Sequence, residues 1–120
     1  MTETKNIQQK LTPVQLEAAN TLSQFHDNIT KKDLRKAYDC MSPNMQKRVS
    51  YEGWAPGFKT TVSSEIYDVK VAFENNDRMA LTYFLKTVDN PGGENNYTGT
   101  AVMAKTAVGW KIEEITNKLK

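Results

Sequence analysis

The sequence predicts an α+β fold, in which N-terminal helices pack on a strongly curved, cone-like antiparallel sheet of four or more strands. Two observations support this prediction. Apolar residues recur at helical spacing through the first half of the chain, and they alternate with polar residues through the second half. Helices followed by strands, without alternation of the two, are typical of α+β proteins. The 120 residues fit a single domain, which we place at residues 12–120.

The first eleven residues are polar and show no periodicity. We expect residues 1–11 to form a flexible tail or a linker left after removal of an export leader. The second alternative implies an extracytoplasmic bacterial location, with the leader itself not present in this chain.

The first helix should begin after Thr12, because Thr12 is a good N-cap, Pro13 suits the first helical position and Gln15 completes a capping box. A helix of this length is marginal alone, so its apolar stripe must pack on another element. The stripe follows helical spacing and consists of Val14, Ala18, Leu22, Phe25 and Ile29.

Three short helical pieces are expected next. Thr30 and Asp33 resemble the start of a capping box for the first piece. Ser42 followed by Pro43 predicts a second helix start, and Ser50 can cap a third turn. Pro56-Gly57 should end that turn.

The second half of the chain reads as strands. The expected strands cover residues 67–73, 79–88, 97–106 and 110–116. In the first of them Tyr67, Val69, Val71 and Phe73 should share one buried face. In the second, one face should carry Met79, Leu81, Tyr83 and Leu85, with Phe84 on the other. Residues 89–96 are expected to form a loop.

A family resemblance adds to this prediction. Ala37-Tyr38, Met41-Ser42-Pro43 and the turn with Trp54, Gly57 and Phe58 follow one another as in small bacterial proteins of one superfamily. In this order of elements the chain resembles the nuclear transport factor 2-like superfamily, whose fold is a cystatin-like α+β cone. The resemblance implies a bacterial member of unassigned function, and many such domains are extracytoplasmic.

Composition argues against several classes of protein. A net charge of +2 gives no support for a nucleic-acid partner. No apolar run reaches the length of a membrane span. Cys40 is the single cysteine, so the chain has neither an internal disulfide nor a cysteine zinc site. With one histidine and scattered carboxylates, we expect no metal and no cofactor.

The candidate site residues are a histidine and three tyrosines that a concave sheet could gather. His26 lies at the edge of the helical stripe and titrates near neutral pH, so it is the single candidate for catalysis. No second acid or base stands at a motif spacing from it, so we assign no catalytic residue. The expected ligand-binding residues are His26, Tyr38, Tyr67 and Tyr83.

These observations favour a non-catalytic binding or association module, for a small hydrophobic ligand or a protein partner, as the mature domain of an exported bacterial protein. One alternative is a small lyase or isomerase that uses His26 and a pocket tyrosine. Another is a homodimerisation module that pairs through the outer sheet face, where Phe84 lies with Ala80 and Thr82.

Overall fold

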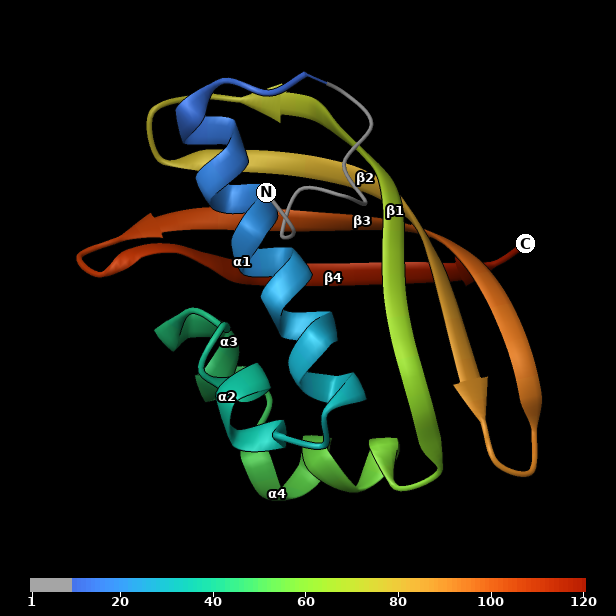
Figure 1. Cartoon of the computed structure of the whole chain (residues 1–120). Coiled ribbons are helices and arrows are strands. Elements are labelled where there is room, and N and C mark those ends of the chain that lie inside the picture. The colour runs from blue at the N-terminus through green and yellow to red at the C-terminus, as the bar shows by residue number, and fades with distance from the viewer. Residues whose placement is uncertain (1–9) are drawn as a thin grey trace.

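The computed structural model describes residues 10–120, so most of the predicted tail at residues 1–11 lies outside the described residues. Four strands form one antiparallel sheet in the order β1-β2-β3-β4, and the helices pack on its concave face, as Figure 1 shows. This arrangement confirms the predicted α+β class and curved antiparallel sheet. The helical elements are α1 (Pro13–Thr30), α2 (Leu34–Tyr38), α3 (Pro43–Arg48), α4 (Tyr51–Trp54) and the 3-10 turn η2 (Ala55–Phe58). The strands are β1 (Thr61–Glu74), β2 (Arg78–Asp89), β3 (Gly93–Thr106) and β4 (Gly109–Leu119).

Helix α1 begins as predicted. The Thr12 hydroxyl accepts a hydrogen bond from the Gln15 amide at 3.2 Å, and the Gln15 side chain accepts one from the Thr12 amide at 3.1 Å. Most of the predicted stripe is buried, but Val14 in the first turn is 44% exposed. Burial of each large stripe residue contributes very roughly 1.5–3 kcal/mol, which fixes α1 to the sheet.

The boundary between α1 and α2 differs from the prediction. Thr30 is the last residue of α1, and Asp33 alone is the N-cap of α2. The Thr30 hydroxyl is instead used between elements, because it donates to the Ser64 carbonyl and accepts from the Ser64 amide, both at 2.9 Å. This pair of bonds fixes the end of α1 to β1.

The short helices form a lid below α1. Ser42 and Ser50 cap α3 and α4 as expected. Pro56-Gly57 does not end the helical segment as predicted, because both residues lie within the 3-10 turn η2. Proline is tolerated in the first turn of a helix, because the amide hydrogen that it lacks would have no partner there. Pro56 can therefore stand at the start of η2.

The lid is attached to the free edge of β4. Met41 forms a parallel bridge with Ile112, and the Ser42 amide donates to the Ile112 carbonyl at 2.8 Å. The Ser42 hydroxyl donates to the Glu113 carboxylate at 2.6 Å, and this bond is the main cause of the lowered pKa of Glu113. The lid is therefore an extension of the sheet edge as well as a cover.

The hairpin between β2 and β3 is longer than predicted. Strand pairing runs to the pair Asp89 and Gly93, so the expected loop at residues 89–96 is reduced to a turn at residues 90–92. Its polar residues fit a strand because this end of the hairpin extends beyond the helices, as Figure 1 shows.

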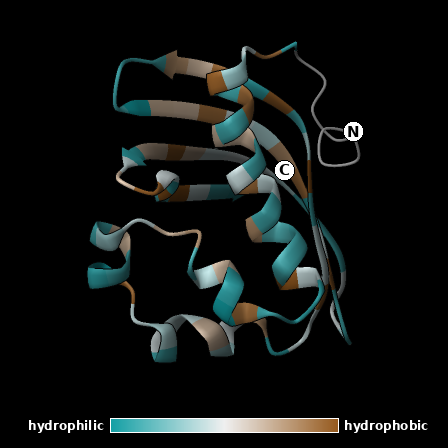
Figure 2. Cartoon of the chain, turned by 60° about the vertical axis from the view of Figure 1, so that its left-hand side comes forward, coloured by the Kyte–Doolittle hydropathy of each residue, from teal (hydrophilic) through white to brown (hydrophobic). Residues whose placement is uncertain are grey.

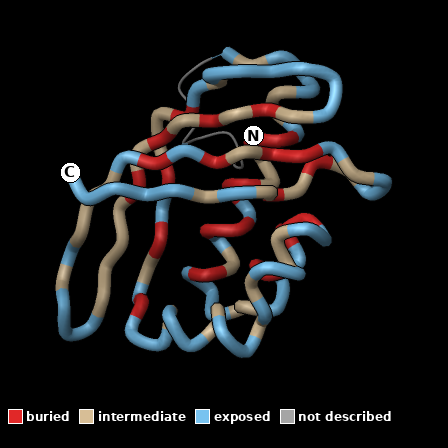
Figure 3. The backbone as a smooth tube through the Cα atoms, turned by 180° about the vertical axis from the view of Figure 1, so that it is seen from behind, coloured by how far each residue is buried: buried red, intermediate tan, exposed pale blue. Residues whose placement is uncertain are grey.

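Alternating residues of the strands divide between a buried inner face and an outer face. Met79, Leu81, Tyr83 and Leu85 of β2 are buried, as predicted, and Thr82 lies on the outer face between them. Figure 2 shows apolar residues in both α1 and the strands that it lies across, and Figure 3 shows buried residues in the same elements. The core therefore lies between the concave face of the sheet and the helices, both α1 and the lid.

The longest helix among the described residues is α1, with 18 residues, and its polar face means that it does not meet the requirements of a transmembrane helix.

Candidate functional site

A cavity of about 370 Å³ lies between α1, the lid and the open end of the sheet. This volume falls in the range of roughly 300–1,000 Å³ that small-molecule sites occupy. Its apolar lining comes from all three parts of the fold and includes Phe25, Ile29, Met45, Trp54, Phe58, Leu85 and Ile115. Its polar lining includes His26, Thr61, Ser64, Thr87, Asp89, Tyr97 and Asn117.

His26 is the most buried ionisable residue of this lining, with 4% of its surface exposed. Its Nδ1 is 2.7 Å from the Ser64 hydroxyl, while its Nε2 is buried without a hydrogen-bond partner in the described structure. Burial lowers the pKa of His26 from 6.5 to about 3, because the imidazolium form would lose its hydration. The imidazole is therefore neutral at neutral pH and keeps one unused hydrogen-bonding position.

Aromatic rings form one wall of the cavity. The ring centroids of Phe25 and Trp54 are 5.9 Å apart, and those of Trp54 and Phe58 are 4.8 Å apart. His26 joins this wall through an edge-to-face contact with Phe25 at 5.0 Å. Offset and tilted packing of this kind is the preferred arrangement of aromatic side chains. The wall places helix α1 and the lid on the same side of the cavity.

Tyr83 lies next to His26 beneath the cavity. Its ring centroid is 6.2 Å from that of His26, and its hydroxyl donates to the Asn117 side chain at 2.7 Å. Burial raises the pKa of Tyr83 above its ordinary value, so the phenol stays protonated. Tyr83 thus orients Asn117, which is one of the polar residues lining the cavity.

The charged groups near the cavity lie at one corner, where β1 begins and β2 ends. Asp89 lines the cavity there and is paired in register with Thr61. The Lys32 ammonium donates to the Thr61 carbonyl and, at 3.4 Å, to the Phe58 carbonyl. One negative and one positive side chain therefore stand at the rim, whereas His26 contacts the Ser64 hydroxyl and the rings of Phe25 and Tyr83.

The structure brings together two of the four predicted ligand-binding residues. His26 lines the cavity and Tyr83 packs against it. Tyr38 does not line the cavity, because its hydroxyl donates to the carbonyls of Val49 at 2.7 Å and Gln46 at 3.2 Å within the lid. The fourth residue, Tyr67, lies on the other side of the sheet.

A bulge in β1 explains the position of Tyr67. Asp68 adopts a φ of 57°, and the register shifts between Tyr67 and Lys70. Tyr67 therefore pairs with Phe84 of the outer face, with ring centroids 5.6 Å apart, while Val69 is buried. The predicted buried face is therefore correct for Val69 and for Val71, which packs against the core, but wrong for Tyr67 and for Phe73, which is 55% exposed.

Several lining residues were missed by the sequence analysis as parts of a site. Ser64 is 38 positions from His26 in the chain, and Asn117 is 34 positions from Tyr83. The aromatic turn with Trp54 and Phe58 was noted for its family resemblance, and its aromatic content was the available signal for a cavity wall.

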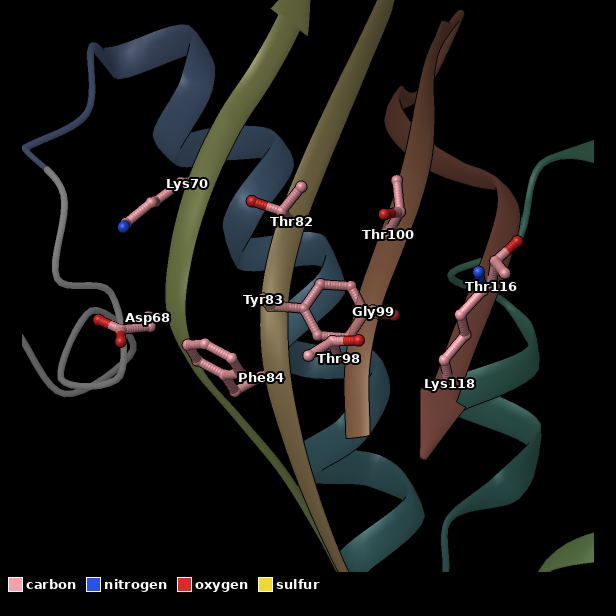
Figure 4. A pocket seen from close by; sticks show the side chains of 10 residues that line it. All are labelled: Asp68, Lys70, Thr82, Tyr83, Phe84, Thr98, Gly99, Thr100, Thr116 and Lys118. Atoms are coloured by element: carbon pink, nitrogen blue, oxygen red, sulfur yellow. The ribbon is translucent and has the colours of Figure 1, made fainter. Parts of the chain in front are cut away.

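A second hollow, of about 400 Å³, lies on the outer face of the sheet and is shown in Figure 4. Thr82, Thr100 and Thr116 form a row across three strands, with Lys70 and Lys118 at its sides. Phe84, predicted as the centre of a dimer face, is covered by Tyr67 and by the Lys120 ammonium at 4.3 Å. The outer hollow combines threonine hydroxyls and lysine ammonium groups with the Phe84 ring, whereas several aromatic rings form a wall of the inner cavity.

The fold is shared with solved structures. Over 93% of this chain and 96% of the other, a protein of unknown function with a cystatin-like fold from Nostoc punctiforme superposes with a TM-score of 0.72 at 12% identity. A SEC-C motif containing protein from Rhodopseudomonas palustris superposes with a TM-score of 0.65 at 11% identity, over 83% of this chain and 77% of that one. No protein-family model and no curated protein matches the sequence. These likenesses show the cystatin-like fold.

Proposed function

We propose that this chain is a non-catalytic binding module that holds a small hydrophobic ligand in the cavity beneath α1. The observation that carries the proposal is the Nε2 atom of His26, which is buried without a partner beside a cavity walled by aromatic rings. A buried polar atom without a hydrogen bond costs stability, and a ligand that bonds to it would recover that cost. Apolar cavities with few placed polar groups are typical of ligand sites.

The protonation state of His26 supports binding over catalysis. A general acid or base works best when its pKa is close to the working pH, and the pKa of His26 is about 3. Tyr83 holds its proton, and its hydroxyl is used by Asn117. These two pKa shifts count against His26 and Tyr83, the histidine and the tyrosine closest to it, as the proton-transfer pair of the lyase or isomerase alternative.

We also propose membership of the nuclear transport factor 2-like superfamily and an extracytoplasmic bacterial location. Support for the first comes from the cystatin-like fold together with the lid, in which Tyr38 and the Ser42 cap hold the short helices in place. The second rests on the sequence resemblance. The alternative is association with a protein partner or a second copy through the outer face. We rank it below ligand binding because Tyr67 and Lys120 cover the ring of Phe84, the apolar residue expected at that interface.

Native mass spectrometry after incubation with an apolar extract of bacterial cells tests the binding proposal. We expect a non-covalent adduct on the order of a few hundred daltons, the size that such a cavity encloses. Ile115→Trp should abolish it by filling the cavity, whereas Thr116→Trp, which places the same ring on the outer face, should retain it. An adduct that survives Ile115→Trp, or its absence from the original chain, would contradict the proposal.

A further inference from the structure

We infer that the ligand is an uncharged, flat apolar molecule with one hydroxyl or amide group, which forms a hydrogen bond with Nε2 of His26. This inference rests on the proposed function and narrows it to a chemical class. Three features carry it: the two nitrogens of His26, the distribution of charge around the cavity, and the shape of its walls.

The hydrogen-bonding group follows from His26. A neutral imidazole has one donor and one acceptor nitrogen, and the Ser64 hydroxyl can serve Nδ1 in either role. Nε2 is therefore a donor in one tautomer and an acceptor in the other. A hydroxyl or an amide satisfies both cases, because each group can donate and accept. A carboxylate can only accept and an ammonium can only donate.

The surroundings of His26 indicate that the ligand carries no charge. The buried part of the lining, with Phe25, Ile29 and Leu85, offers no ionised side chain among the described residues. A charge placed there would lose its hydration without a counter-charge. At the rim, Asp89 and Lys32 carry opposite charges, so the rim favours neither a cation nor an anion strongly.

The flat shape follows from the two walls. Trp54 and its aromatic neighbours Phe25 and Phe58 stand on the helical side, and Leu85 and Ile115 stand on the sheet side. A ring system fits between an aromatic wall and an aliphatic floor, and it buries large apolar area with few rotatable bonds.

Three probes with one carbon frame test the inference: 2-naphthol, 2-naphthylmethylamine and 2-naphthoate. We expect isothermal titration calorimetry at neutral pH to give the tightest binding for 2-naphthol, with each charged probe about tenfold weaker or more, as expected for a buried group left without a matched partner. The chain has one histidine, so nitrogen-15 NMR of the untagged protein reports His26 alone. Its Nε2 resonance should move on addition of 2-naphthol, without protonation of the ring.

The outcomes distinguish a failure of the inferred ligand class from a failure of the proposed binding function. If the charged probes bind as tightly as 2-naphthol, or if Nε2 does not respond, the inference is overturned while the cavity still binds ligands. If none of the three binds, both fail. His26→Phe, which keeps a ring and removes the nitrogens, should weaken the binding of 2-naphthol about tenfold more than it weakens the binding of unsubstituted naphthalene. The outer-face control Tyr67→Phe should bind both as the original chain does.

Discussion

The two faces of the sheet are built from the same strands, yet the hollows that they border differ in composition. On β2, Leu81 and Tyr83 face α1 and are buried, while Thr82 and Phe84 face outward. The inner face borders a cavity with aromatic rings and a neutral histidine, and the outer face borders a hollow with threonines and lysines. The difference lies in what stands opposite, because the helices pack on the inner face and no helix of the described residues packs on the outer one, as Figure 1 shows.

One position connects the two faces. Gly99 of β3 is paired with Tyr83 of β2, and the Tyr83 ring occupies the space where a Cβ of Gly99 would stand. Figure 4 shows the ring beside this glycine. An aromatic ring over a cross-strand glycine compensates for the missing side chain. Tyr83 can therefore reach Asn117 at the cavity because β3 has no side chain at that position.

The largest contrast between the faces is expected from neighbouring residues of β2. Leu81 is fully buried, so Leu81→Ala should lower the free energy of unfolding by about 2–5 kcal/mol through lost burial and a residual cavity. Thr82→Ala on the outer face should cost less than about 1 kcal/mol. Urea denaturation of both variants measures the difference. Equal losses would mean that the outer face is buried in the native assembly.

A second contrast comes from two glycines. A Cβ at Gly99 would stand 2.4 Å from both the Asn117 side-chain oxygen and the Tyr83 ring. Gly99→Ala should therefore destabilise the protein by about 1–3 kcal/mol, the usual cost of overpacking, and should displace Tyr83 from Asn117. Gly57→Ala is the control, because a Cβ there meets no atom within 4 Å. Thermal unfolding of the two variants would show whether the fold depends on the missing side chain at Gly99.

The sequence was sufficient for the fold because periodicity reports burial directly. The stripe from Ala18 to Ile29 and the alternation from Met79 to Leu85 each mark a buried face, and both were predicted correctly. Serine caps at Ser42 and Ser50 gave the starts of α3 and α4. These signals depend on residues close together in the sequence, so they predict helices and strands without knowledge of the tertiary contacts.

The cavity could be predicted only in part, because its geometry depends on register and on distant contacts. His26 stood out as the single histidine, but its partner Ser64 is one of several serines without a motif. Tyr67 was placed on the inner face because strict alternation was assumed through Asp68. A bulge at an aspartate with positive φ leaves little trace in sequence, and it moves every earlier residue to the opposite face.

A smaller effect, the dependence of the free energy of unfolding on pH, is expected from His26 on the inner side of the sheet. Its pKa is 6.5 in the unfolded reference and about 3 in the folded protein. As the pH falls below 6.5 the unfolded state binds a proton that the folded state does not, so the free energy of unfolding decreases toward pH 3. Between pH 6.5 and about 5 the loss should be about 1–2 kcal/mol. The lowered pKa of Glu113 acts below its ordinary 4.5 and lies outside this window.

Denaturation curves at several pH values check this effect, with His26→Phe as the control. The variant should not show this loss of stability between pH 6.5 and about 5, because it lacks the buried imidazole that causes the loss. A variant that loses stability as the original chain does would assign the effect to other groups and would remove the argument that burial keeps His26 neutral.

The smallest effect is expected at the centre of the outer face. Thr100 is exposed and lies between Thr82 and Thr116 in the row across the sheet. Thr100→Val keeps the β-branched shape, so the free energy of unfolding should change by less than about 0.5 kcal/mol, and the affinity for 2-naphthol should not change. Sedimentation velocity on the original chain and on Thr100→Glu completes the test. If the outer face joins two copies, the buried carboxylates of Thr100→Glu would repel one another and the sedimentation coefficient would fall. An unchanged coefficient would argue against pairing of two copies through the outer face.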